Sequence, residues 1–579
     1  MHTVVAGTVI FTFYFFEILV EIEAGDSNTV YAMLIKILVE YNVPLNKLIG
    51  ICSDGANTMR GVHKGVCIQL EKYLRTLRED TMHAIIVAQD VHIRRTIDSF
   101  HVSRGILSVH CVCHRLALVL TDAIKGTQKL EQCIPDNVIE LLNMLYNYFA
   151  RSPIRKKAMR ELITFENAYN KRQAIQRLQA EPRRVPHPDI VRPNPVEELE
   201  QVMDMLLEST KLPRRIVLTR WLSCADAVRV VLNSRLVYIN YFSNENNGKS
   251  VAILDLLEDS NNFAWYACMH DVLPVLTRMN VLFQSSLPLP HLLYQKITTA
   301  KATLINMVGD RATRTELLPL ESVNVYTSFG AYANKFIKDT TGPAALHGSS
   351  LNDNEVLFLK KAWHKLYAHC LKQIDSRFPP ENIYVFKLMQ VLDPSVVHGV
   401  LRRELIGTDS LAVVVEKLLH IFEIPLHTSG MACLSTEEIK NSFIVFNVSA
   451  LCGDLWREMT QPHNVQEQRR RGQQPLDYSL VYPYYRKLML LLPDIKPWAM
   501  FALFVLVFPT GNAIAERGFS AMGATHTKQR SELGRDQVFA NLIIGFNGPS
   551  VTEFTAQLDN ESRQRHWPLY LCPITNNLQ

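Results

Sequence analysis

Apolar positions in the first part of the chain alternate between strand-like and helix-like spacing. Residues 9–23 are rich in β-branched and aromatic side chains, which is typical of a strand. After the turn Gly25-Asp26-Ser27, apolar residues recur at helical spacing as far as Tyr41. Residues 48–52 and 106–112 are two further short apolar runs, each followed by a helical pattern. This alternation predicts an α/β layer that contains at least some parallel strands.

The pattern changes after Lys125 to long helical segments, which continue to about Pro493. The middle of the chain is therefore predicted to be a helical domain. Two polar stretches interrupt it, at residues 172–195 and 461–477, and their proline and charge content predicts surface loops or disordered inserts. We see no repeat with a period of about 20 to 50 residues, which argues against a solenoid.

The last part of the chain carries more apolar surface than one helix face requires. Residues 498–507 are apolar on every side, which predicts a helix that is buried on every side. Residues 537–546 form a short amphipathic helix with a broad apolar stripe. We predict that this stripe packs partly against a second copy of the segment in a two-fold interface. The predicted dimerisation residues are Phe519, Val538, Phe539, Leu542, Ile543 and Phe546.

Composition places few limits on function. The chain has 579 residues, of which 47% are hydrophobic and 20% charged, as in soluble globular proteins with several domains. A formal charge of +5 is too small to indicate a nucleic-acid partner by itself. The 11 cysteines are scattered without CxxC spacing, so we expect reduced thiols. The apolar runs 4–16 and 498–509 are shorter than the roughly 20 residues of a membrane span, so we expect core segments and no membrane partner.

Four separated motifs have the order and spacing found in one family. They are Ser53-Asp54-Gly55-Ala56-Asn57-Thr58-Met59, Val109-His110-Cys111-Val112-Cys113-His114, Thr219-Arg220-Trp221 and Glu516-Arg517-Gly518-Phe519-Ser520. Together they resemble the second-aspartate, C-x-x-H, Arg-Trp and glutamate motifs of hAT (hobo/Activator) DNA transposases and their domesticated relatives. Each motif is weak alone, but four in order make a strong case.

The resemblance implies a fold class and a domain organisation. The implied fold is an α/β ribonuclease-H-like core interrupted by a large all-α insertion domain, with the first core strand missing. The first part of the core would occupy residues 1–125 and the helical insertion residues 126–490. Residues 491–579 would hold the rest of the core and the hAT dimerisation region. The resemblance also implies a nuclear location.

The resemblance further implies a metal site. Asp54 and Glu516 would be catalytic carboxylates that hold Mg²⁺, in a site where two metal ions about 4 Å apart stabilise a phosphoryl displacement. Family members carry a first aspartate on an earlier strand, and we expect that this chain begins after it. Asp26 lies in a turn, where a turn-forming side chain is the ordinary explanation. Glu17 and Glu21 are poor substitutes by position.

Other motif residues have structural explanations beside the functional ones. Arg220 and Trp221 would contact DNA by resemblance, and Trp221 would stack on a flipped base; the alternative is a tryptophan that anchors a helix. Cys111 and His114 would lie near DNA, or would pack at a strand end. Asp54 also suits a helix N-cap. Glu516 could simply pair with Arg517 on an exposed helix face. A basic stretch could contact phosphates, or form a solvated helix face: Arg151, Arg155, Lys156, Lys157 and Arg160.

These observations lead to one functional hypothesis and one rival. The leading hypothesis is a transposase-derived protein with an incomplete catalytic site, which acts through homodimerisation and through DNA or protein binding. The rival is an active Mg²⁺-dependent hAT transposase whose N-terminal part is missing from this sequence. A third reading, an unrelated helical scaffold, would require four ordered motif matches to be accidental.

Overall fold

A computed structural model describes most of the chain up to residue 511. The described ranges, with short gaps inside them, are residues 2–76, 107–125, 133–165, 212–213, 222–341, 351–398, 410–428, 434–460 and 480–511. By contacts the chain divides into two units. The first comprises residues 1–44, 52–70 and 512–579, and the second comprises residues 45–51 and 71–511. The predicted domain boundaries at residues 125 and 490 stay predictions.

Five short strands form a single sheet in the order β3-β2-β1-β4-β5. They are β1 (His2–Val5), β2 (Thr8–Phe13), β3 (Phe16–Glu21), β4 (Gly50–Ser53) and β5 (Leu107–His110). β1, β2 and β3 form an antiparallel meander, in which Val4 pairs with Val9 and Ile10 with Leu19. β1 and β4 are parallel, and His2 pairs with Ser53. The predicted strand at residues 9–23 is thus two strands of a hairpin.

The helices of the first unit follow the predicted spacing. Helix α1 (Ser27–Glu40) buries Val30, Leu34, Ile37 and Leu38. Its first turn is capped by Asp26, whose Oδ1 accepts hydrogen bonds from the backbone N–H of Asn28 at 2.9 Å and of Thr29 at 3.2 Å. Helices α2 (Asn57–Arg60) and α3 (Val66–Thr76) follow β4.

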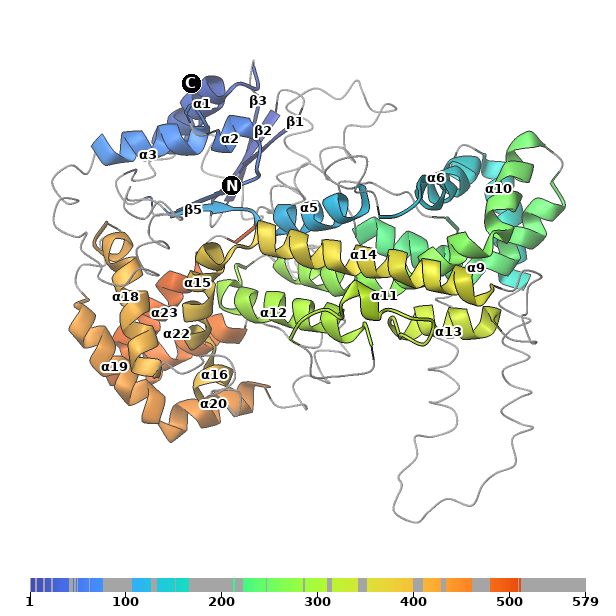
Figure 1. Cartoon of the computed structure of the whole chain (residues 1–579). Coiled ribbons are helices and arrows are strands. Elements are labelled where there is room, and N and C mark those ends of the chain that lie inside the picture. The colour runs from blue at the N-terminus through green and yellow to red at the C-terminus, as the bar shows by residue number, and fades with distance from the viewer. Residues whose placement is uncertain are drawn as a thin grey trace, which may run out of the picture. The chain divides into compact units, whose positions relative to one another are not determined.

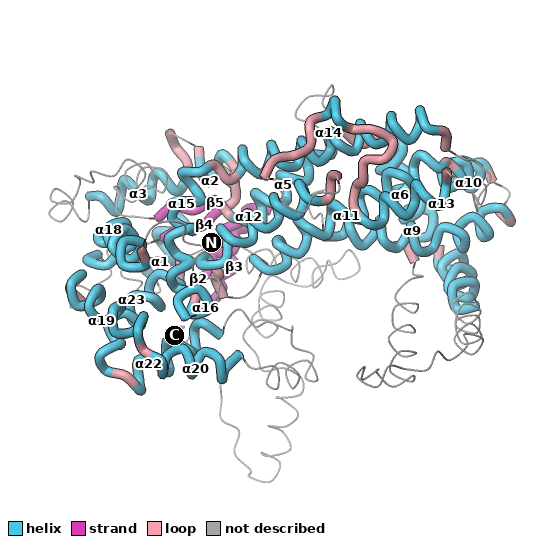
Figure 2. The backbone as a smooth tube through the Cα atoms, turned by 60° about the horizontal axis from the view of Figure 1, so that its bottom comes forward, coloured by secondary structure: helices cyan, strands magenta, loops and turns pink. Residues whose placement is uncertain are grey.

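Helices make up most of the second unit (Figures 1 and 2). Helix α11 (Ser260–Phe283) is its most buried long helix and packs mainly against α5 (Val112–Lys125), α9 (Leu222–Ser243), α12 (Pro290–Asn306) and α13 (Ala331–Thr340). Around these lie α6 (Asp136–Ala150), α10 (Gly248–Glu258) and α14 (Asp353–Arg377). Arg377 and Asp122 form an ion pair that joins α14 to α5.

Besides α23 (Lys496–Leu506), which the sequence predicted to be buried on every side, the second unit has several later helices. They are α15 (Pro380–Leu388), α16 (Pro394–His398), α18 (Leu411–Thr428), α19 (Thr436–Val448), α20 (Ala450–Thr460) and α22 (Val481–Leu491). α23 packs against α19 and α22 and buries Trp498, Phe501 and Val505. Its other face, with Met500, Leu503 and Phe504, is only partly buried, so the predicted burial on every side is wrong for that face. Complete burial of one such side chain stabilises the fold by roughly 1.5–3 kcal/mol, so this helix is a core element.

The expected fold class is wrong. Helices account for most of the described chain, and the strands are four to six residues long. An α/β ribonuclease-H-like core interrupted by a large all-α insertion is not evident, and the described protein is mostly helical. The error arose because three short apolar runs in the sequence were interpreted as the strands of a complete core layer. Most of the burial lies instead on helices between Val138 and Leu506.

Among the described residues, no helix combines the length and the apolar content that a membrane crossing requires. The two apolar runs of the sequence are accounted for in other ways. The run at residues 4–16 falls on strands β1 to β3, as its β-branched and aromatic content predicted. The run at residues 498–509 falls largely on the buried helix α23.

Candidate functional site

Asp54 lies directly after β4, at the start of the segment that leads into α2 and α3. Its Oδ1 accepts a hydrogen bond from the backbone N–H of Ala56 at 3.2 Å, which closes a tight turn. The side chain of Asp54 does not cap α2, because Ala56 occupies the N-cap position without a side-chain hydrogen bond. The carboxylate is partly exposed at the carboxyl end of the strand. The structural alternative for Asp54 is therefore a turn residue rather than a helix cap.

Two glycines of the same motif are explained by close backbone packing. A Cβ atom added to Gly65 would lie 2.5 Å from the backbone nitrogen of Gly61 and 2.7 Å from the carbonyl oxygen of Met59. The backbone N–H of Gly65 donates to the carbonyl of Gly61 at 2.8 Å. Cys67 is the second residue of α3, and its Sγ lies 3.6 Å from Oγ of Ser53. The spacing of the motif thus folds the segment after Asp54 back onto the end of β4.

The segment that resembles the C-x-x-H motif joins β5 to α5. The backbone N–H of Val112, the first residue of α5, donates a hydrogen bond of 2.9 Å to the carbonyl oxygen of Thr510. An N–H in the first turn of a helix has no partner within the helix, so this bond satisfies one such group. Thr510 is buried and lies six residues before the predicted glutamate motif. The C-x-x-H segment therefore meets Thr510, a residue far from it in the sequence, at the head of α5.

The side chains of this segment are mostly packed inside the second unit. Cys111 is 0% exposed and Cys113 is 3% exposed. The Cys113 carbonyl accepts a bond of 3.4 Å from the side-chain amide of Asn280, and the Cys113 thiol faces the carbonyl of Asn280 at 3.9 Å. The ring of His114 lies 5.6 Å from that of His110 and is partly exposed. This geometry favours the packed-strand-end explanation for the cysteines, and it leaves His114 the more accessible group.

Residues missed by the sequence analysis hold α5 in place. Arg115 is buried, and its guanidinium carbon lies 4.5 Å from the ring centroid of Phe378, just beyond the end of α14. Asp122 of α5 forms an ion pair with Arg377, the last residue of α14. No periodicity signals such contacts, because the partners are more than 250 residues apart in the sequence. They show that α5 is anchored as a structural element of the helical unit.

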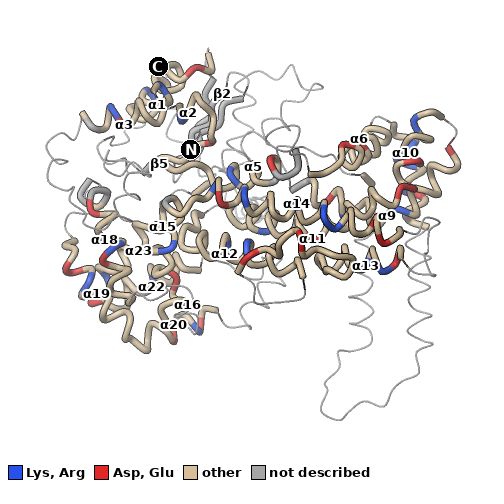
Figure 3. Tube along the Cα trace, in the orientation of Figure 1, with Lys and Arg blue, Asp and Glu red and all other residues tan. Residues whose placement is uncertain are grey.

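The basic stretch is largely committed to structure. Arg155 donates to the carbonyl of Tyr148 at 3.4 Å and lies over the Tyr148 ring at 4.1 Å. Lys156 donates to the carbonyl of Ala150 at 2.8 Å. Both cations therefore bind the C-terminal carbonyls of α6, where positive charge is favourable. Lys157 is exposed and lies 4.0 Å from Glu161. Figure 3 shows Lys and Arg interspersed with Asp and Glu over the helices of the second unit rather than gathered by sign.

Several predicted site residues lie outside the described part of the chain. They are Arg220, Trp221, Glu516, Phe519, Val538, Phe539, Leu542, Ile543 and Phe546. The approach of Asp54 and Glu516, the DNA contacts of Arg220 and Trp221, and the dimer interface therefore stay predictions. Among the residues that are described, no group of three or more His, Cys, Asp or Glu side chains could hold a metal ion. The Mg²⁺ site also stays a prediction.

Asp26, the only early aspartate, serves as a local cap. Its Oδ2 accepts a hydrogen bond of 2.6 Å from the hydroxyl of Thr29, in addition to the two backbone bonds at Oδ1. The side-chain and backbone hydrogen bonds from Thr29 lower the pKa of Asp26 below its ordinary value. Both carboxylate oxygens thus stabilise the start of α1, as the turn chemistry of Gly25-Asp26-Ser27 predicted.

Comparison with known proteins adds no relative. No family model matches this chain, and no curated protein matches it.

Proposed function

We propose that this chain is a transposase-derived protein of the hAT type that acts by dimerisation and by binding DNA or protein partners, without cleaving DNA. The observation that carries the proposal is the hydrogen bond between Val112 and Thr510. It brings the C-x-x-H segment to the segment that precedes Glu516, as a protein built around these motifs requires. The ribonuclease-H-like fold is not part of the proposal. A nuclear location follows from the same resemblance.

The proposal of binding without cleavage rests on the state of the early carboxylates. A two-metal site needs several carboxylate oxygens that are directed at the cations. Asp26 uses both of its oxygens to cap α1, and Oδ1 of Asp54 is bonded to the backbone of its own turn. Glu17 and Glu21 lie on β3, which pairs with β2 and is separated from β4 by two strands, β2 and β1. The described carboxylates therefore support structure better than they support catalysis.

An active transposase is the second candidate, and one observation favours it. Asp54 is partly exposed at the carboxyl end of β4, which runs parallel to β1. A carboxylate at such an edge is accessible to a cation. Strand cleavage that depends on Asp54 would establish this alternative.

Dimerisation is tested by size-exclusion chromatography with light scattering on the full chain. The parent is expected to elute as a dimer at micromolar concentration, and a Phe539→Asp/Phe546→Asp variant as a folded monomer. Leu490→Asp is the matched control, since Leu490 is 85% exposed on α22. A monomeric parent, or a double variant that dimerises as well as the parent, would contradict the interface. Unfolding of the double variant alone would show that the stripe belongs to the core.

A further inference from the structure

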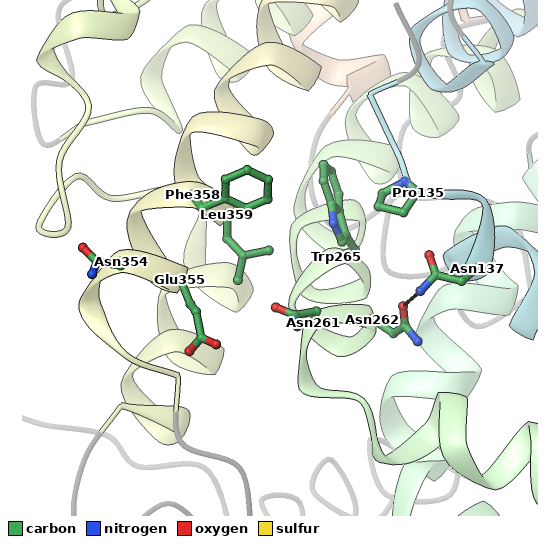
Figure 4. Close-up of a pocket in the computed structure, with 9 residues that line it drawn as sticks. All are labelled: Pro135, Asn137, Asn261, Asn262, Trp265, Asn354, Glu355, Phe358 and Leu359. Carbon is green, nitrogen blue, oxygen red and sulfur yellow. Dashed lines mark hydrogen bonds between the residues drawn. The ribbon is translucent and has the colours of Figure 1, made fainter. Parts of the chain in front are cut away.

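A pocket of about 410 Å³ opens between the N-terminal ends of α6, α11 and α14, all within the second unit. Figure 4 shows Phe358 and Leu359 of α14 facing Trp265 of α11 across the gap. Phe358 is 76% exposed, although large aromatic side chains are usually buried in a monomer. Trp265 is 4% exposed and forms part of the opposite wall. Two aromatic side chains thus flank a space large enough for one long side chain of a ligand.

Asparagine side chains line the lower part of this pocket. Asn262 is buried, its Oδ1 accepts from Nδ2 of Asn137 at 2.8 Å, and its own Nδ2 donates to the carbonyl of Leu256. These two bonds hold the Asn137 and Asn262 amides in a defined orientation. Asn261 is exposed beside them. An amide side chain offers both a donor and an acceptor, which matches the N–H and C=O groups of an extended peptide backbone.

The charge around the pocket is negative. Carboxylates stand at or beside the first turn of each of the three helices: Asp136, Asp259, Asp353 and Glu355. The helix N-termini themselves contribute roughly half a positive charge each, so the four carboxylates outweigh them. Arg235 of α9 interacts electrostatically with Asp259 and Glu258 and so offsets part of this charge. Lys360 of α14 is buried and donates to the carbonyl of Val325. A cationic ligand is therefore favoured, and an anionic one such as phosphate is not.

We propose that this pocket binds an extended, basic peptide segment of a partner protein, with one Lys or Arg side chain packed against the exposed ring of Phe358. The aliphatic stem of such a side chain packs on apolar surface, while its charged end interacts with aromatic faces and carboxylates. The exposed amides of Asn261 and Asn354, which also line the pocket, bind the peptide backbone. The protein contains a cation–π contact of this kind internally, since the guanidinium carbon of Arg235 in α9 lies 4.0 Å from the ring centroid of Phe263 in α11. None of the lining residues belongs to the motifs that we propose to bind DNA.

Binding is tested by fluorescence anisotropy with the full chain and a labelled peptide, Gly-Ser-Lys-Arg-Lys-Ser-Gly. The peptide should bind saturably, and more weakly as salt is added. Phe358→Ala should weaken binding about fivefold to tenfold, because it removes the exposed aromatic ring against which the basic side chain packs. Glu355→Gln should weaken it severalfold. Glutamine can keep the bond from the backbone N–H of Asn352 that Glu355 now accepts at 2.8 Å, so the capping box is retained.

Matched controls separate loss of the pocket from loss of the fold. Leu490→Ala and Asp494→Asn alter exposed positions on and just after α22, and both should bind the peptide like the parent. Circular dichroism should show that Phe358→Ala is folded, as its exposure predicts. Three outcomes would overturn the proposal: no binding by the parent, equal binding by Phe358→Ala, or equal affinity for a peptide with glutamine in place of Lys and Arg. Displacement of the peptide by a single-stranded oligonucleotide that itself requires Phe358 would overturn it too.

Discussion

The carboxylate of Asp271 in α11 lies directly against Gly330, so that a Cβ atom on Gly330 would stand 2.4 Å from Oδ2 of Asp271. Asp271 accepts hydrogen bonds from the backbone N–H of Tyr332 at 3.1 Å and of Ala333 at 2.9 Å. It therefore caps α13 from another helix. Burial raises the pKa of Asp271, and the bonds from Ala333 and Tyr332 oppose that rise.

Gly330→Ala is predicted to destabilise the protein by about 2–4 kcal/mol. Gly330 has a φ of +62°, which a residue with a Cβ adopts only with strain of about 1–3 kcal/mol. The methyl group would also displace the Asp271 cap, which contributes about 1 kcal/mol. Urea denaturation measures the change. Gly248→Ala is the control, because nothing lies within 4 Å of a Cβ there and its stability should be unchanged or slightly raised. Equal stability of the two variants would contradict this account.

Stability is predicted to fall in mild acid because of His291. Burial lowers the pKa of His291 to about 4 from an ordinary value of 6.5. The native chain thus holds this imidazole neutral while the unfolded chain protonates it. The contribution is complete above pH 6.5 and is lost as the pH falls toward about 4, with a total of about 3 kcal/mol. In His291→Leu, the midpoint of urea denaturation should depend less on pH across this range than it does in the parent. The midpoint should keep the parent's slope in His63→Gln, which alters an exposed position. An unchanged slope in His291→Leu would exclude His291 as the cause.

The basic stretch is predicted to divide into structural and surface residues. Arg155→Ala/Lys156→Ala should lower the free energy of unfolding by about 1–2 kcal/mol, since it removes a cation–π contact and two bonds to the end of α6. Lys157→Ala should change it by less than about 0.5 kcal/mol, because this side chain is 80% exposed. Thermal or urea unfolding distinguishes the two. The reverse ranking would mean that the α6 contacts contribute little.

Local sequence chemistry predicted individual elements well. The Gly25-Asp26-Ser27 turn, the buried face of α1 and the buried helix near Trp498 all follow from spacing and from turn residues. These features depend on neighbours within a few positions. The prediction of the fold class was wrong because the share of the core that strands and helices each form depends on long-range packing. The hairpin between β2 and β3 was also missed, since Tyr14 and Phe15 carry no glycine or asparagine turn signal.

The candidate site was predictable only in part. Sequence placed Asp54 after a strand, as the structure has it. It placed Cys111 inside a strand at residues 106–112, whereas β5 ends at His110 and α5 begins at Val112. It could not indicate that Thr510 caps α5 or that Asn280 binds Cys113, because such pairings are decided by tertiary contacts. The pocket beside Trp265 and Phe358 was missed for the same reason. Its walls come from three helices whose ends meet only in the folded chain.

The most direct test of binding without cleavage is an agarose gel of supercoiled plasmid incubated with the full chain in Mg²⁺ or Mn²⁺. The gel is read before and after the protein is removed. The account predicts retarded plasmid in the first lane and intact supercoiled plasmid in the second, with Asp54→Ala giving the same pattern. Nicked or linear plasmid after removal of the protein, formed by the parent and not by Asp54→Ala, would contradict the account and would identify Asp54 as a catalytic metal ligand.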